Sequence, residues 1–168
     1  MARRIDYSAR YNFTTHQVYS ALRDRDYWED CVEEMRKFSP NHIESFVVDD
    51  SGIELLLHHI LPREMLPEVA QTVMRKDMVI TRKQSYSFGD EVTGKYEASI
   101  PAGPGSLTGT MRLFPTDTGC TLRTSSEAKV YIPVMGPRLE QLMLVNLIDL
   151  FRAEAEVMQR FIEKRQIA

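Results

Sequence analysis

A small set of polar and ionisable side chains carries the chemistry that this sequence can offer to a bound molecule. Three of them, Arg82, Gln84 and Tyr86, are spaced two residues apart where apolar and polar residues alternate. Residues two apart on a β-strand face the same way, and the alternation predicts that His59 and Tyr96, on other strands, share that inner face. Because an unpaired charge in an apolar interior is costly, a buried Arg82 needs a carboxylate, a carbonyl or an anionic ligand.

Two interpretations of these residues stay open from the sequence. In the first, Arg82 and Gln84 orient the polar end of a ligand whose apolar part is held by the walls of a cavity. In the second, Arg82 lies near the rim of the sheet and its charged end reaches water. His59 is either a general acid or base or a hydrogen-bonded core histidine. No catalytic residue is assigned.

The sequence contains no motif for metal binding, phosphate binding or nucleophilic catalysis. His58 and His59 are adjacent on a predicted strand and face opposite ways, while His16 and His42 have no partners at ligand spacing. Neither a His-Glu-x-x-His nor a Cys-x-x-Cys motif occurs, and the Gly-Pro-Gly stretch at 103–105 is typical of a turn. We therefore expect neither a metal ion nor a cofactor.

Composition and charge restrict the class of protein and its partners. The chain has 168 residues and a net charge of -3, which suits one domain over 1–168 and provides no basic surface for nucleic acid. No apolar stretch approaches the roughly 18 residues of a membrane span, and no signal peptide begins the chain. Cys31 and Cys120 lie far apart, which favours a reducing compartment. We expect a cytoplasmic protein without a transmembrane segment.

The hydrophobic pattern predicts an α+β fold made of one strand, two short helices, some six further strands and one long helix. Connections as short as those between the later strands force antiparallel neighbours. A break at 63–75 is predicted to hold a loop with one helical segment. The predicted elements are a strand at 5–13, helices beginning near Thr14 and Asp24, strands at 43–49, 53–61, 77–88, 91–100, 106–115 and 119–131, and a helix from Pro137 to about Ile162.

Alternation also predicts which side chains of these strands face the helix. The predicted inward set is Leu55, Leu57, His59, Met78, Ile80, Arg82, Gln84, Tyr86, Gly94, Tyr96, Ala98, Ile100, Gly109, Met111, Leu113, Leu122, Thr124, Ser126, Ala128 and Val130. Several of them are small, namely Gly94, Ala98, Gly109, Thr124, Ser126 and Ala128. Small residues at a concave surface leave unfilled volume. Either the helix packs close to the sheet and fills this volume, or a cavity remains. A curved sheet beneath a straight helix favours the cavity.

We predict that a ligand in this cavity contacts apolar and polar residues of the strands and of the long helix. The predicted set is Leu57, His59, Ile80, Arg82, Gln84, Tyr86, Tyr96, Ala98, Met111, Leu113, Thr124, Ser126, Met143, Leu147 and Leu150. The first half of that helix, 139–151, is apolar around nearly its whole circumference. Two alternatives stay open for the side of this helix that is turned away from the sheet. Either loops and the N-terminal helices cover it, or it is exposed and forms a dimer contact or a mobile gate over the cavity.

Several short stretches, taken in order, resemble a known superfamily. They are Tyr27-Trp28, Leu61-Pro62 with Leu66-Pro67, Ser99-Ile100-Pro101, Gly109 to Leu113, Lys129 to Gly136, Leu139-Glu140, and Glu154 to Glu156. Their order and spacing resemble the START-like superfamily, also called the helix-grip or SRPBCC fold. More closely, they resemble a bacterial START-like family described only as a domain of unknown function.

The resemblance implies a helix-grip fold, in which a curved antiparallel sheet of about seven strands wraps on a long C-terminal helix, with two short helices after the first strand. It also implies a cavity for lipids, sterols, polyketides or similar ligands. It implies no reaction, because members of the superfamily include carriers, cyclases, aromatases and co-chaperones.

Three functional hypotheses follow. The first is a non-enzymatic binding or carrier protein for an apolar or amphipathic small molecule. The second is an enzyme of the polyketide cyclase or aromatase type, which predicts that His59, Arg82 or Tyr86 converge at the cavity. The third is a protein-interaction module or homodimer that uses the apolar start of the long helix, with Leu144, Val145 and Ile148 buried by the partner.

Overall fold

The computed structural model describes residues 3–37, 40–65, 68–72, 75–99, 105–131 and 136–165. Twelve elements follow one another along the chain: β1 (Arg3–Tyr11), α1 (Thr15–Leu22), α2 (Arg25–Met35), β2 (Asn41–Val48), β3 (Gly52–Leu61), a 3-10 turn (Arg63–Met65), α3 (Glu68–Gln71), β4 (Met78–Phe88), β5 (Val92–Ser99), β6 (Gly105–Thr116), β7 (Gly119–Val130) and α4 (Gly136–Arg165). This is the predicted order, and it confirms the α+β class.

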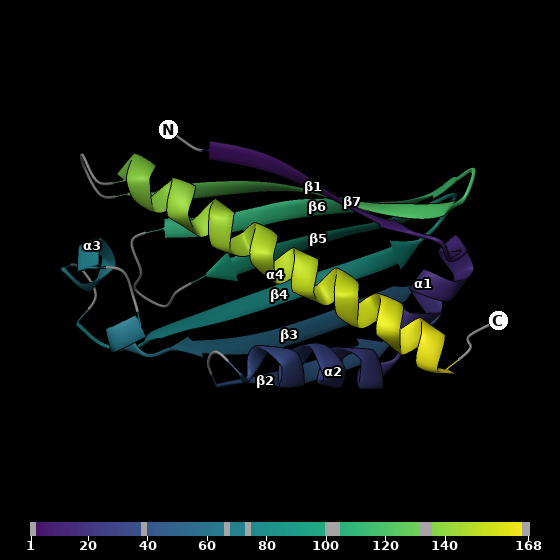
Figure 1. The fold of residues 1–168 in the computed structure, drawn as a ribbon, viewed down its shortest axis with the longest axis horizontal. Coiled ribbons are helices and arrows are strands. Elements are labelled where there is room, and N and C mark those ends of the chain that lie inside the picture. Colours follow the sequence, from purple (N-terminus) through teal and green to yellow (C-terminus); the bar gives the residue numbers. More distant parts are fainter. Residues whose placement is uncertain are drawn as a thin grey trace.

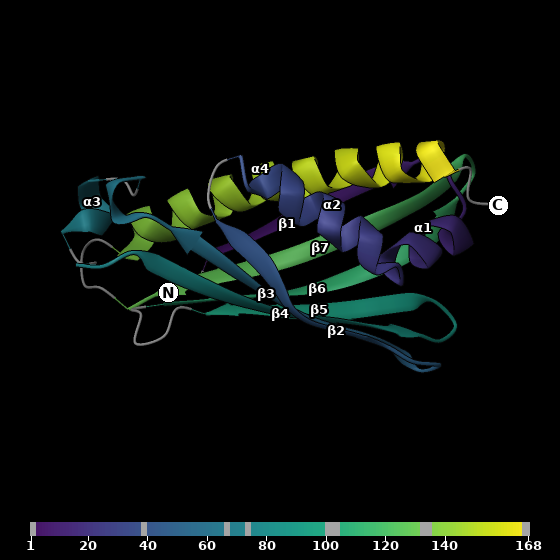
Figure 2. The same ribbon diagram turned by 90° about the horizontal axis from the view of Figure 1, so that it is seen from below.

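The seven strands form one antiparallel sheet in the order β1-β7-β6-β5-β4-β3-β2. Its edges are β1 and β2, because each of these strands pairs on one side only. Helix α4 crosses the sheet diagonally from the β1 edge towards the β2 edge (Figure 1). Figure 2 shows that the sheet curves beneath α4, and that α1 and α2 lie on the same side of it. The arrangement is the helix-grip fold.

The two short helices begin at well-formed caps. The hydroxyl of Thr14 accepts a bond from the Gln17 backbone N–H at 3.1 Å, and Oε1 of Gln17 accepts one from the Thr14 backbone N–H at 2.8 Å. This reciprocal arrangement satisfies two backbone donors that a helix start leaves free. Asp24 caps α2, which buries Tyr27, Trp28, Cys31 and Val32 at helical spacing. The caps therefore define where α1 and α2, the two helices that follow β1 in the chain, begin.

The alternation of side chains along the strands places the core where the sequence predicts it. The buried residues confirmed among the predicted inward set are Leu55, Leu57, Arg82, Gln84, Tyr86, Tyr96, Ala98, Met111, Leu113, Thr124, Ser126 and Ala128. Met78 and Ile100 were also predicted to face inward. The structure describes only the backbone of Met78, and Ile100 lies outside the described residues.

β1 and β2 differ from their predicted extent by two residues at an end, more than the other strands do. β1 ends at Tyr11 rather than at 13, although Phe13 still packs against the core. β2 begins at Asn41 rather than at 43, and its pairing with β3 shifts by one residue between Ile43 and Ser45. That β-bulge changes which residues of β2 face outward, since one extra residue reverses the alternation.

Both cysteines, Cys31 and Cys120, are free thiols buried in the core. Burial raises the pKa of both thiols, to about 11 for Cys120. Among the helices that the structure describes, none is both long enough and apolar enough to cross a membrane.

Candidate ligand-binding site

A cavity lies between the inner face of the sheet and α4. Five residues of the predicted ligand set line it: Gln84, Tyr86, Tyr96, Met111 and Thr124. The remaining lining residues were not in that set: Tyr7, Ala9, Tyr11, Leu22, Tyr27, Trp28, Leu122, Phe151, Glu154 and Ala155. A wider hollow on the outer face of β1, β7 and β6 is lined mainly by polar and charged side chains, so it does not suit an apolar ligand.

The cavity is narrower than the small inward residues led us to expect. The space open to a water-sized sphere is about 30 Å³, which is room for about two water molecules. A Cβ atom on Gly109 would meet the ring of Tyr96, and one on Gly94 would come within 2.7 Å of the ring of Tyr86. The volume left by these glycines is thus filled by tyrosine rings from neighbouring strands. In this conformation the interior is nearly full.

A buried ion pair joins the sheet to α4 beside the cavity. Nη2 of Arg82 lies 2.7 Å from Oε2 of Glu154, and the side chains are 3% and 13% exposed. Burial lowers the pKa of Arg82, but the attraction of Glu154 outweighs this effect. The pKa of Arg82 is therefore raised above its usual value, and the guanidinium stays charged. Arg82 therefore lies inside the molecule and not at the rim of the sheet. Of the partners that the sequence left open, it has a carboxylate, that of Glu154. Its Nε has no hydrogen-bond partner in the part of the chain described.

Two further polar pairs lie on the sheet side of the cavity, and Gln84, Tyr86 and Tyr96 of these pairs line it. Gln84 Nε2 donates to the hydroxyl of Tyr86 at 2.6 Å, and the hydroxyls of Tyr96 and Ser126 lie 2.6 Å apart. Burial raises the pKa of both tyrosines, to about 12 for Tyr96. Both phenols therefore keep their protons and can donate hydrogen bonds to a ligand.

Aromatic side chains of α2 and α4 close the other side. The ring centroids of Tyr27 and Trp28 lie 4.9 Å apart, and Phe151 lies 6.0 Å from Tyr7 and 6.1 Å from Tyr96. The hydroxyl of Tyr27 donates to the backbone carbonyl of Glu154 at 3.2 Å. The cavity thus has aromatic walls around one buried ionic group, a combination found in many small-molecule sites.

His59 faces inward, as predicted, but does not line the cavity. Its Nε2 is buried without a hydrogen-bond partner among the described residues. Burial and, to a smaller extent, the positive charge of Arg82 lower the pKa of His59 to about 3, so the imidazole is neutral. The hydrogen bonds described for Arg82 go to Glu154, and the one described for Tyr86 comes from Gln84. Among the described residues, no hydrogen bond joins His59 to either of them.

The other predicted ligand-set residues surround the cavity without lining it. Those that are buried are Leu57, Arg82, Ala98, Leu113, Ser126 and Leu147, and those that are half-buried are His59, Ile80, Met143 and Leu150. The set missed the residues contributed by β1, α2 and the second half of α4. For β1 the signal was available, since Tyr7, Ala9 and Tyr11 fall on one face of a clean alternation. For α4, the lining residues could not be identified without knowing how the helix is rotated about its axis, because this decides which side chains face the sheet.

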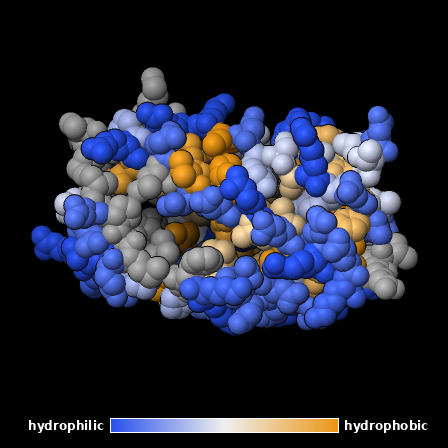
Figure 3. Space-filling view, in the orientation of Figure 1, coloured by the Kyte–Doolittle hydropathy of each residue, from blue (hydrophilic) through white to orange (hydrophobic). Residues whose placement is uncertain are grey.

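The first half of α4 is covered only in part. Apolar side chains gather over this stretch on an otherwise mostly hydrophilic face (Figure 3). Leu144 is buried by its own chain, whereas Val145 is 48% exposed.

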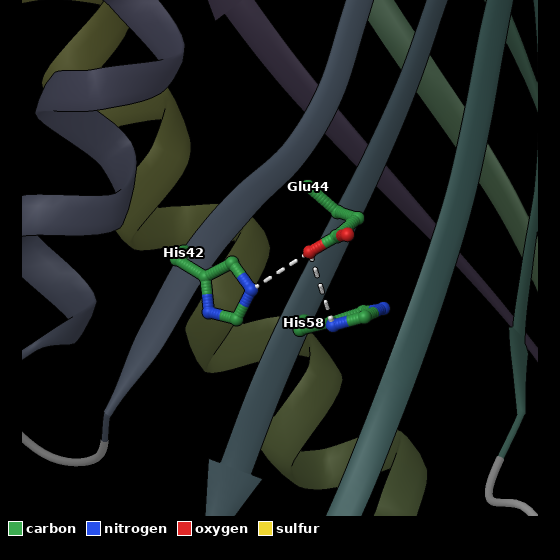
Figure 4. A group of neighbouring side chains, drawn as sticks. All are labelled: His42, Glu44 and His58. Carbon is green, nitrogen blue, oxygen red and sulfur yellow. Dashed lines mark hydrogen bonds and ion pairs between the residues drawn. The ribbon is translucent and has the colours of Figure 1, made fainter.

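The outer face of β2 and β3 brings together side chains that the sequence left apart. His42 was predicted to lack partners, but its Nε2 lies 3.0 Å from Oε2 of Glu44, and Nδ1 of His58 lies 3.7 Å from the same oxygen (Figure 4). The prediction was wrong because the bulge in β2 pairs His42 with His58 rather than with His59. A regular hairpin would have turned His42 inward.

Comparison with known proteins places the chain in a group without an established function. The model of the family described as "Protein of unknown function (DUF2505)" matches residues 6–162. Uncharacterized protein Rv0481c of Mycobacterium tuberculosis is 28% identical over 170 residues, covering 96% of this chain and 95% of that protein.

Solved structures share the fold at low sequence identity. The di-domain ARO/CYC StfQ from the steffimycin biosynthetic pathway matches with a TM-score of 0.60 and 13% identity, over 99% of this chain and 52% of that one. Protein SA2116 from Staphylococcus aureus, of unknown function, matches with a TM-score of 0.58 and 13% identity, over 99% and 96%. Ara h 8.0201 matches with a TM-score of 0.54 and 10% identity, over 94% and 98%.

Proposed function

Since the chain belongs to the DUF2505 family and has a helix-grip fold, we propose that it binds an amphipathic small molecule between the sheet and α4. The apolar body of the ligand lies against Phe151 and the tyrosine rings. Its polar end lies against the ion pair of Arg82 and Glu154. The protein acts as a carrier or binding protein, and a reducing compartment such as the cytoplasm suits its two free thiols.

The observation that carries this proposal is the buried ion pair beside an aromatic-walled cavity. Removing two charges from water costs several kcal/mol for each ion, and replacing such a pair by apolar residues is often neutral or stabilising. Arg82 and Glu154 are therefore poorly explained by stability alone. Buried charges with polar neighbours in a cavity are typical of ligand sites.

The ligand has to enlarge the cavity as it enters. A space that holds about two waters does not accommodate a lipid or a polyketide, so some wall must move. Phe151 is half-buried and comes from α4, so a change of its rotamer or a small shift of α4 enlarges the space without breaking the sheet. We propose that α4 is the movable wall.

The cyclase or aromatase alternative has weaker support. The fold shared with the ARO/CYC protein is compatible with it. Acid–base catalysis, however, requires groups aimed at one reacting point, and the described bonds of Arg82 and Tyr86 go to other partners. A homodimer through the start of α4 is a third proposal, supported by the exposed side chain of Val145.

A cavity-filling substitution tests the proposed site. Ala155→Leu adds apolar atoms where the cavity is lined, and Ala153→Leu makes the same change two residues away, outside the lining. Titration with the fluorescent apolar probe anilinonaphthalene sulfonate is expected to show affinity reduced at least about tenfold, or about 1.4 kcal/mol, in Ala155→Leu only. Equal reductions in both variants, or in neither, would place probe binding elsewhere.

A further inference from the structure

A second candidate site lies on the outer face of the sheet, away from the cavity. It consists of His42 and Glu44 on β2 and His58 on β3 (Figure 4). In that view the helices lie behind the strands that carry the three side chains, so the group faces away from α4. The side chains of His42, His58 and Glu44 are 47%, 28% and 50% exposed, so a dissolved ion can reach them.

The β-bulge builds this group. Ile43 pairs with Leu57 and Ser45 pairs with Leu56, so Glu44 is the extra residue between two ladder positions. The same shift sets His42 directly opposite His58. Bulges re-aim side chains and are frequent next to functional sites, and here the bulge places a carboxylate between two imidazoles.

The spacing of the three donor atoms suits a small metal ion. In tetrahedral coordination with ligand bonds of about 2.0–2.1 Å, two ligand atoms lie about 3.3 Å apart. The carboxylate oxygen of Glu44 lies 3.0 Å from the His42 nitrogen and 3.7 Å from the His58 nitrogen, and all three donors lie within 4.8 Å of one another. Small side-chain rotations bring them around one centre.

We propose that His42, Glu44 and His58 form a site for a divalent transition-metal ion, with Zn²⁺ as the reference case. Two imidazole nitrogens and one carboxylate oxygen are ligands that zinc, copper and nickel accept, whereas calcium and magnesium prefer oxygen alone. Water or a group of another molecule completes the coordination. The ion also links the edge strand β2 to β3, so it is expected to stabilise the hairpin.

Titration of the whole protein with zinc chloride after dialysis against EDTA tests this proposal. Calorimetry is expected to show one bound ion, and zinc is expected to raise the melting temperature because it binds only the folded state. His42→Ala and His58→Ala are expected to lose more than about 100-fold in zinc affinity, the upper end of what loss of an outer-shell partner costs. Cobalt in place of zinc should give visible absorption bands in the wild type but not in His42→Ala or His58→Ala.

The matched control is His16→Ala, which removes an exposed histidine on α1. This variant should bind zinc like the wild type, and the His42 and His58 variants should still bind the apolar probe. Unchanged zinc affinity in His42→Ala and His58→Ala, or no binding by the wild type up to millimolar zinc, would overturn the proposal.

Discussion

At the scale of single residues, the interior is organised around the ion pair of Arg82 and Glu154. Alternation along β4 predicted that Arg82 faces inward, and the cost of a buried charge predicted that it has a partner. The identity of that partner was beyond the sequence. Glu154 lies 72 residues further along the chain, on α4. The sequence does not distinguish it from the other acidic residues of α4, because the face that packs against the sheet is known only from the structure.

Glu154→Gln removes the charge that compensates Arg82 and leaves the guanidinium buried. Breaking such a pair is expected to reduce the free energy of unfolding by about 3–5 kcal/mol, measured by urea denaturation. The double variant Arg82→Met with Glu154→Met should recover most of the loss, because neither charge is then left unpaired. Glu91→Gln breaks the exposed pair with Arg112 and is expected to have a far smaller effect. A similar effect for both Gln variants would contradict the role given to burial.

At the scale of elements, a period of two specified the strands and their inner faces, because each strand has one buried face. It failed at the start of β2, where one extra residue reverses the alternation. Nothing in the residue types around Ile43 and Ser45 marks a bulge. The alternation also identified Gly94 and Gly109 as inward positions, but it did not show that tyrosine rings of the neighbouring strands cover them.

Gly109→Ala tests the packing of β5 on β6. The added methyl group meets the ring of Tyr96. We expect the ring to move away, which breaks the hydrogen bond between the hydroxyls of Tyr96 and Ser126. Overpacking of this kind is expected to lower the free energy of unfolding by about 1–3 kcal/mol. Gly89→Ala is the control, since the nearest atom to its Cβ is 3.8 Å away. Thermal and urea denaturation measure both variants, and equal stability of Gly109→Ala and the wild type would refute close packing here.

At the scale of the whole molecule, the order of elements was sufficient to predict an antiparallel sheet covered by one long helix, because short connections leave few alternatives. The helix-grip fold itself was implied by the resemblance to the START-like superfamily. The size of the cavity was not predictable in the same way. It depends on how the rings of Tyr86, Tyr96 and Phe151 pack together, which is a property of the folded chain. The interior is nearly full, so the proposed ligand can enter only if a wall moves, which is why we propose α4 as the movable wall.

Native mass spectrometry of the purified protein, repeated after organic extraction, tests the central claim most directly. We predict an added mass on the folded protein that extraction removes and that an amphipathic compound with an apolar body restores. The Ala155→Leu variant should carry less of this compound than Ala153→Leu. A protein mass without any addition, unchanged by fatty acids, sterols and aromatic polyketides, would contradict the proposal that the space between sheet and α4 holds a ligand.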